Sequence, residues 1–198
     1  MRIAFLLGAG CPLAIRVPDG GGTKPLIPDI AGLTEQVRSA IESSQAHASS
    51  FVALLKHLTD DGHEKPNVEE ILSRIRGLRG FIGARTIDGL SKGMLETLEG
   101  AICDRTTEIV RARLPSTGTP YHQLAAWIRG IKRSHPVEIF TPNYDLLIEQ
   151  APEESRVPYF DGFVGSDRTF FDVGAMEQDD LPPRWARLWK LHGSINWW

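Results

Sequence analysis

Three short stretches of the sequence carry residues that could do chemistry. The first is a small-residue turn that follows an apolar run: Gly8, Ala9 and Gly10. Its bare backbone could let the pyrophosphate of a nucleotide approach amide groups. In TPNYD, the Asn143 amide could bridge a sugar hydroxyl or a water, and the Asp145 carboxylate could accept an N–H group. In KLHGS, His192 is of the residue type that most readily exchanges protons at neutral pH.

Each stretch also has a structural interpretation. GAG could be an ordinary strand-to-loop turn, because Leu13 stands where the dinucleotide fingerprint would have its third glycine. TPNYD could be an Asx-type turn that caps a helix beginning at Leu146. His192 could be a structural histidine, and Cys11 is interpreted as a small buried residue because no histidine stands near it.

The three stretches each follow a predicted strand. Ile3 to Leu7 is a continuous apolar run, typical of a central strand buried on both faces. Val137 to Phe140 is a short segment with β-branched and aromatic residues, and Arg187 to Leu191 is similar, so the two segments predict two more strands. Because sites in open α/β sheets lie at the carboxyl ends of the strands, the three stretches are the candidates for a common site.

The opening MRIAFLLGAGCP has a second interpretation, as the start of a lipoprotein signal. Its apolar run is at the short limit for such a signal, and Gly8 stands where the cleavage box would want leucine. We therefore favour a first strand followed by a phosphate-binding turn.

The rest of the chain predicts a helical insertion between the first two strands. Residues 11–29 are rich in glycine and proline and predict an irregular flap. Apolar residues at helical spacing follow, and Asn67 with Glu70 predicts a capping box at the start of one helix. We expect an α/β fold in one domain over residues 1–198, with a Rossmann-like parallel sheet and a helical insertion at about 30–133.

Composition excludes several classes of function. The net charge is -3 and basic residues are interleaved with acidic ones, so we expect no direct nucleic-acid binding. Two cysteines cannot build a disulfide framework or a four-thiolate zinc site, and the histidines lack metal-ligand spacing, so we expect no metal and a cytoplasmic location. No apolar stretch approaches the ~18 residues of a membrane span, so we expect no membrane association.

Taken in this order, GAG, FTPNYD and KLHGSINW resemble the sirtuin-like domain of bacterial anti-phage defence proteins. In that family GAG is followed by Pro-Asp, and Pro18 and Asp19 stand here at the matching spacing. The family's fold has later strands that complete the sheet, so the sequence is expected to lack the C-terminal part of the fold.

The resemblance implies NAD as the substrate, without a metal. The GAG turn would hold the pyrophosphate, together with Pro18 and Asp19. Asn143 would order the attacking water or the nicotinamide ribose, Asp145 would receive the carboxamide, and His192 would act as a base on a ribose hydroxyl.

The implied activity is that of an NAD glycohydrolase that releases nicotinamide and ADP-ribose. Its setting would be anti-phage defence by NAD depletion, as a homo-oligomer or with a partner such as a HerA-type ATPase or an Argonaute-like protein. Two alternatives stay open. A catalytically silent nucleotide-binding or scaffolding module is favoured by Pro12 and Arg16, where the family usually has serine and glycine. A protein deacylase is disfavoured, because deacylating sirtuins carry a zinc module with four cysteines.

Overall fold

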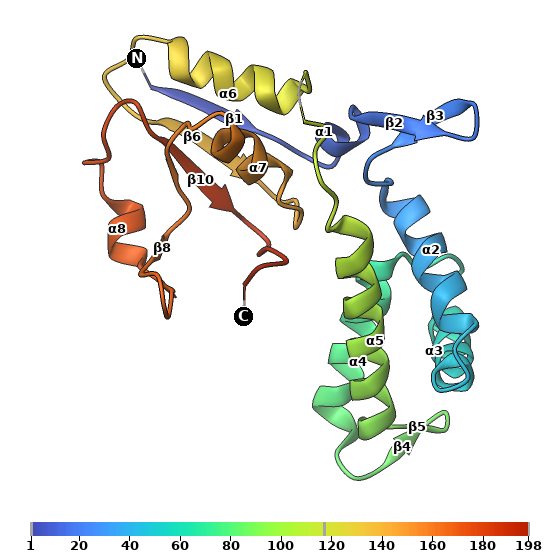
Figure 1. The fold of residues 1–198 in the computed structure, drawn as a ribbon. Helices are drawn as coiled ribbons and strands as arrows, with labels where there is room; N and C mark the ends of the chain where they lie inside the picture. Colours follow the sequence, from blue (N-terminus) through green and yellow to red (C-terminus); the bar gives the residue numbers. More distant parts are fainter. Residues whose placement is uncertain (1, 117, 198) are drawn as a thin grey trace. The chain divides into compact units, whose positions relative to one another are not determined.

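The computed structural model describes residues 2–116 and 118–197. The chain divides into two compact units. The first comprises Met1–Ile27 and Arg111–Trp198, and the second comprises Pro28–Val110 (Figure 1). The three candidate stretches all lie in the first unit.

The first unit is built on a parallel sheet with the strand order β1-β6-β10-β7. These strands span Ile3–Leu6, Val137–Thr141, Ala186–Lys190 and Tyr159–Phe160. The parallel sheet with flanking helices confirms the predicted Rossmann-like α/β class. The strands that precede the three candidate stretches, β1, β6 and β10, are neighbours in the sheet.

Helices cover one face of this sheet. Register aligns two rows of apolar residues on that face: Ile3, Val137 and Ala186, then Phe5, Ile139 and Leu188. Helix α6 (Pro120–Gly130) packs there, with Trp127 edge-on to Phe5 at 5.5 Å between ring centroids. Helix α7 (Leu147–Glu154) packs against α6. After β6, the unit also contains three short elements: β8 (Phe163–Val164), β9 (Phe170–Phe171) and α8 (Val173–Glu177).

The central position predicted for the first strand is not what the structure shows. Among the strands of residues 2–116 and 118–197, β1 lies at the edge of the sheet, and Leu6 on its second face is 73% exposed. An apolar run shows that a strand can be buried but does not show how many neighbours it has. The pairing partner alone decides whether such a strand is central.

The irregular flap predicted for residues 11–29 is also corrected. Helix α1 (Gly10–Leu13) leads into an antiparallel hairpin of β2 (Arg16–Asp19) and β3 (Gly22–Pro25). Gly20 and Gly21 have φ angles of +50° and +93°, which suit the two-residue turn that joins such strands. The many glycines and prolines therefore mark a tight hairpin rather than a loop.

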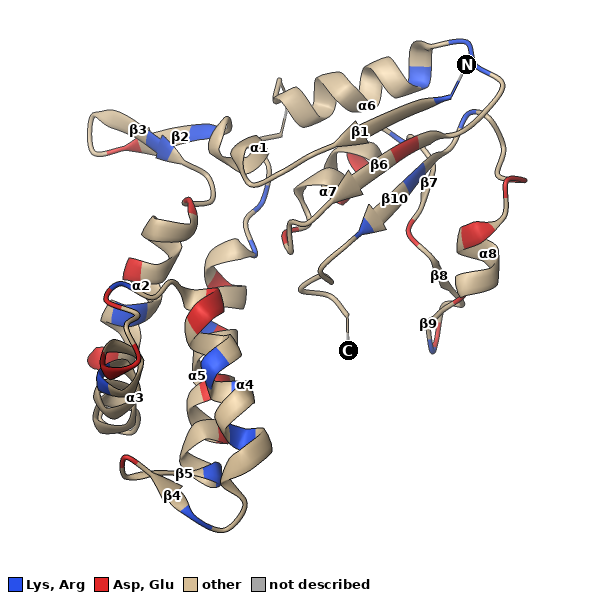
Figure 2. Cartoon of the chain, turned by 180° about the vertical axis from the view of Figure 1, so that it is seen from behind, with Lys and Arg blue, Asp and Glu red and all other residues tan. Residues whose placement is uncertain are grey.

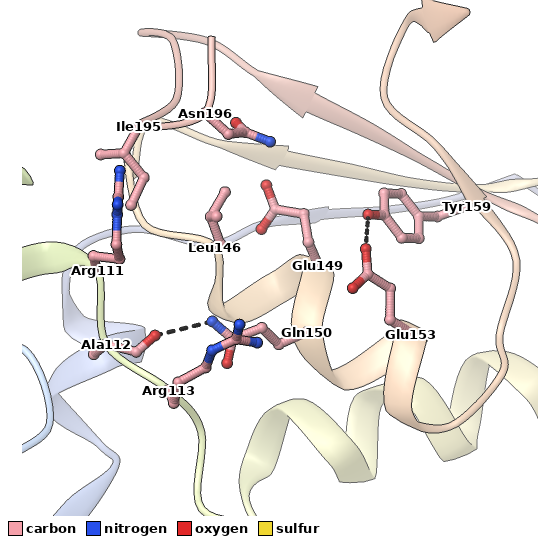
Figure 3. Close-up of a pocket in the computed structure, with 10 residues that line it drawn as sticks. All are labelled: Arg111, Ala112, Arg113, Leu146, Glu149, Gln150, Glu153, Tyr159, Ile195 and Asn196. Atoms are coloured by element: carbon pink, nitrogen blue, oxygen red, sulfur yellow. Dashed lines mark hydrogen bonds between the residues drawn. The ribbon is translucent and has the colours of Figure 1, made fainter. Parts of the chain in front are cut away.

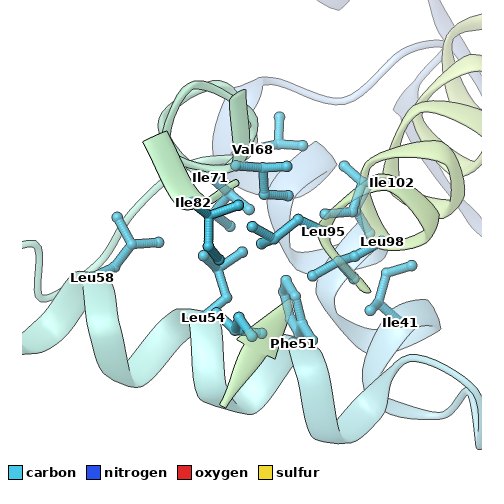
Figure 4. Packing of buried hydrophobic residues seen from close by; sticks show 13 residues of the cluster. Ile41, Phe51, Leu54, Leu58, Val68, Ile71, Ile82, Leu95, Leu98 and Ile102 are labelled. Atoms are coloured by element: carbon cyan, nitrogen blue, oxygen red, sulfur yellow. The ribbon is translucent and has the colours of Figure 1, made fainter. Parts of the chain in front are cut away.

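The second unit is helical, as predicted. It contains α2 (Ile30–Glu42), α3 (Ala48–Asp60), α4 (Val68–Ile82) and α5 (Lys92–Val110), with a hairpin of β4 (Thr86–Ile87) and β5 (Leu90–Ser91). All four helices contribute to one apolar core, in which Phe51, Leu54, Leu95 and Leu98 are fully buried (Figure 4). Helix α6, expected within the insertion, belongs to the first unit.

Charges on the second unit are paired rather than gathered. Acidic and basic positions are interleaved along α4 and α5 (Figure 2). Glu99 accepts hydrogen bonds from Arg76 at 2.7 Å and from Arg79, and Arg79 also contacts Glu96 at 3.2 Å. Over residues 2–116 and 118–197, no helix combines the length and apolar character needed to cross a membrane.

The capping box predicted at α4 is confirmed. The Asn67 side chain accepts from the N–H groups of Glu69 and Glu70, at 2.9 and 3.0 Å, and Glu70 accepts from the Asn67 N–H at 2.8 Å. We expect Asn67→Ala to lower the free energy of unfolding of the second unit by about 1 kcal/mol, because a helix-end donor loses its acceptor. Urea denaturation measures this change in the free energy of unfolding. Ser44→Ala, which lies outside the helix caps, is the control, and an equal decrease in that variant would contradict the capping role of Asn67.

Candidate functional site

The GAG turn and the TPNYD turn meet at the end of the sheet. Asn143 Nδ2 donates to the Gly8 carbonyl at 3.1 Å, although the two residues are 135 positions apart in the sequence. The Thr141 hydroxyl donates to the Leu7 carbonyl at 2.7 Å and accepts from the Asn143 N–H at 3.1 Å. Parallel pairing of β1 with β6 explains the meeting, because it brings both carboxyl ends to one edge.

The KLHGS turn joins the same edge through β10. The Leu191 N–H donates to the Thr141 carbonyl at 2.9 Å, and the Ile195 N–H donates to the Tyr144 carbonyl at 3.1 Å. His192 is exposed, with its ring centroid 6.4 Å from that of Tyr144. The structure therefore brings all three turns together, while a single cavity lined by their side chains stays a prediction.

Asp145 forms the Asx turn that the sequence left open as an alternative. Its Oδ1 accepts from the Leu147 N–H at 3.0 Å, at the start of α7, and the residue is only 5% exposed. Burial raises the pKa of Asp145, whereas the Leu147 N–H and the nearby Lys190 ammonium act in the opposite direction. One carboxylate oxygen therefore has a structural role already.

A buried ion pair beside Asp145 was not anticipated from the sequence. Lys190 Nζ lies 3.1 Å from Glu149 Oε1 and donates to the Asp145 carbonyl. Both side chains are less than one tenth exposed. Burial raises the pKa of Glu149 to about 7 despite the opposing Lys190 charge. The sequence does contain one sign of this ion pair. Lys190 is a charged residue on the same strand face as Ala186 and Leu188, so a buried partner of opposite charge was to be expected.

Pro18 and Asp19 lie in the exposed β2–β3 hairpin. The described contact of the Asp19 carboxylate is with Lys24 of the same hairpin, at 3.4 Å. The structure thus places these two residues in a local turn, and their part in binding NAD stays a prediction.

Comparison with known families finds a match for part of the chain. Residues 137–198 match the family model described as SIR2-like domain. The matched segment includes β6, β10 and the TPNYD and KLHGS turns, and it covers less than half of the chain. The match supports a sirtuin-related, NAD-binding module, in agreement with the resemblance stated from the motifs. No curated protein matches the chain.

Side chains that could hold a metal do not cluster among the described residues. Within the part of the chain that the structure describes, no group of three or more His, Cys, Asp or Glu residues could hold a metal ion. The two cysteines, Cys11 and Cys103, are free and partly buried, and burial raises the pKa of both thiols.

Proposed function

We propose that this chain is an NAD glycohydrolase that releases nicotinamide and ADP-ribose. The observation that carries the proposal is the hydrogen bond between Asn143 and the Gly8 carbonyl, at 3.1 Å. It joins the turn proposed to hold the pyrophosphate to the amide proposed to order the water or the ribose. A poised water and stabilisation of an oxocarbenium-like ribose are what cleavage of the N-glycosidic bond needs.

The glycines of the GAG turn support a ligand at this place. A Cβ built on Gly8 or Gly10 would meet no atom within 4 Å, and neither residue has a positive φ angle. Packing and backbone conformation therefore do not require glycine at either position. Close approach of a ligand to the backbone would explain both glycines.

His192 would act as the base on a ribose hydroxyl. It lies in the turn after β10 and is exposed, so a substrate can reach its ring. The proton would move from the hydroxyl to a ring nitrogen, while Asn143 keeps the water or the ribose in line.

A nucleotide-binding module without catalysis is the second candidate. The state of Asp145 favours it, because this carboxylate is buried and already accepts the Leu147 N–H at 3.0 Å. A deacylase lacks comparable support, since two cysteines cannot supply a four-cysteine zinc module.

Release of nicotinamide separates the two candidates. The purified chain is incubated with NAD, alone and with candidate partner proteins, and nicotinamide is measured by chromatography. A glycohydrolase yields nicotinamide and ADP-ribose in equal amounts. Binding of NAD without any release would support the silent module instead.

Asp145→Ala should raise the KM for NAD more than it lowers kcat. The proposed contact with the carboxamide exists in both the ground state and the transition state, so its loss weakens binding uniformly. Steady-state kinetics measures the two constants. Asp145→Asn is the matched control for folding, because its amide oxygen can still accept the Leu147 N–H. A fall in kcat with unchanged KM would contradict the assigned role.

The cellular setting is proposed from the resemblance alone. It comprises cytoplasmic defence against phage by NAD depletion, assembly as a homo-oligomer, and control by a partner such as a HerA-type ATPase or an Argonaute-like protein. Such control would keep the isolated chain weakly active. High turnover by a monomer would contradict it.

A further inference from the structure

A pocket of about 340 Å³ lies beside α7 in the first unit (Figure 3). Its lining comes from α7, from β7, from the segment that follows α5 and from the segment that follows KLHGS. None of the residues proposed to bind or cleave NAD is among those that line it. Its volume is in the range of small-molecule sites.

Gln150 fixes one wall of the pocket. Its Nε2 donates to the Ala112 carbonyl and its Oε1 accepts from the Leu114 N–H, both at 2.9 Å. Gln150 is 7% exposed, so these hydrogen bonds are shielded from water. The segment that carries Arg111 and Arg113 is therefore held against α7 rather than free to swing away.

The two arginines make this wall positive. Arg111 and Arg113 both line the pocket and are exposed, and no ion pair is described for either within the ranges that the structure covers. The pocket's carboxylates have other partners. Glu149 lies 3.1 Å from Lys190, and Glu153 accepts from the Tyr159 hydroxyl at 2.7 Å. The two guanidinium groups are thus available to an anion.

Glu149 provides an unsatisfied acceptor in the same pocket. Its Oε1 lies near Lys190, whereas its Oε2 is buried and has no hydrogen-bond partner among the described atoms. Figure 3 shows the carboxylate on the side of α7 that faces Asn196. A buried acceptor without a partner is unfavourable, so a ligand that donates a hydrogen bond to it would remove this penalty.

We propose that this pocket binds a phosphorylated ribose compound. The phosphate would lie between Arg111 and Arg113, whose planar forks match its oxygens. Glu149 Oε2 would accept a hydrogen bond from a ribose hydroxyl, as acidic side chains do in dinucleotide-binding folds. This site is separate from the residues proposed to cleave NAD, so it goes beyond the proposed function and does not depend on it.

Calorimetric titration of the whole chain with ribose 5-phosphate tests the site. We expect saturable binding of one molecule per chain, and a loss of affinity of roughly tenfold or more in Arg111→Ala/Arg113→Ala, because charge-assisted contacts to the phosphate disappear. Both arginines are exposed, so the variant should fold. Arg184→Ala is the matched control, since Arg184 is also exposed and does not line the pocket.

Two further variants distinguish binding in this pocket from binding at the GAG turn and from binding of any small anion by the arginines. Gly10→Val blocks the turn and should leave the affinity for ribose 5-phosphate unchanged. Glu149→Gln should weaken ribose 5-phosphate and leave inorganic phosphate unaffected. The proposal is overturned by absence of binding, by equal affinity in the double-arginine variant, by loss of binding in Gly10→Val, or by inorganic phosphate binding as tightly as ribose 5-phosphate.

Discussion

We expect His192→Ala to lower the rate of nicotinamide release by about 10²- to 10⁴-fold, the usual contribution of a general base. The side chain is exposed in a turn, so its removal leaves no cavity in the core and the fold should be unchanged. The measurement is single-turnover cleavage of NAD at saturating protein, with the thermal melt recorded on the same preparation.

His63→Ala is the matched control, because His63 is an exposed histidine in the second unit and should leave cleavage unaffected. Asn143→Ala should also abolish most cleavage, and it additionally removes the hydrogen bond to the Gly8 carbonyl, worth about 1 kcal/mol. Near-native hydrolysis by His192→Ala with an unchanged melt would show that another residue is the base.

Lys190→Met should strongly destabilise the first unit. It leaves the Glu149 carboxylate buried without its cation, which typically costs about 3–5 kcal/mol. The loss should depend on pH, because burial raises the pKa of Glu149 to about 7 even with Lys190 present. Because the pKa is raised, the buried Glu149 is protonated and uncharged at pH 5 and charged at pH 8. The free energy of unfolding of the variant should therefore approach that of the wild type at pH 5 and lie furthest below it at pH 8.

Urea denaturation at both pH values measures this difference. Lys132→Met is the matched control, since Lys132 is exposed, and it should change the free energy of unfolding little. Glu149→Leu/Lys190→Met removes both charges and should recover much of the stability lost at pH 8. A loss that is the same at pH 5 and pH 8 would show that Glu149 is not the group left uncompensated.

Local patterns were sufficient to predict the helices of the insertion and the three strands that precede the candidate stretches. The Asn67 capping box predicted the start of α4, and three short segments rich in β-branched, aromatic or other apolar residues predicted β1, β6 and β10. The order of motifs indicated a sirtuin-like domain, and the family match over residues 137–198, which include TPNYD and KLHGS, supports this interpretation. The parallel sheet of the α/β fold was predicted because helices lie between those strands in the sequence. Features that depend on neighbours in space could not be predicted from local patterns, as the edge position of β1 shows.

The ion pair of Glu149 and Lys190 illustrates what sequence could not provide. In TPNYDLLIEQ a glutamate near the start of a helix is typical of a solvent-exposed position. Its burial depends on Lys190 and on the faces of α7 and β10 that meet, which no local pattern records. The β2–β3 hairpin was missed for a different reason, because Gly20 and Gly21 were counted as loop composition instead of as a paired turn.

The parallel pairing of Ile3 with Val137 has a consequence for folding kinetics. Contacts so distant in sequence form slowly, because the intervening chain must lose its freedom before any pairing is gained. The four inserted helices have a core of their own, built from contacts that are closer in sequence. We therefore expect them to condense first and to shorten the flexible connection between β1 and β6. Substitutions in that helical core would then delay the meeting of Gly8 with Asn143, although they touch neither residue.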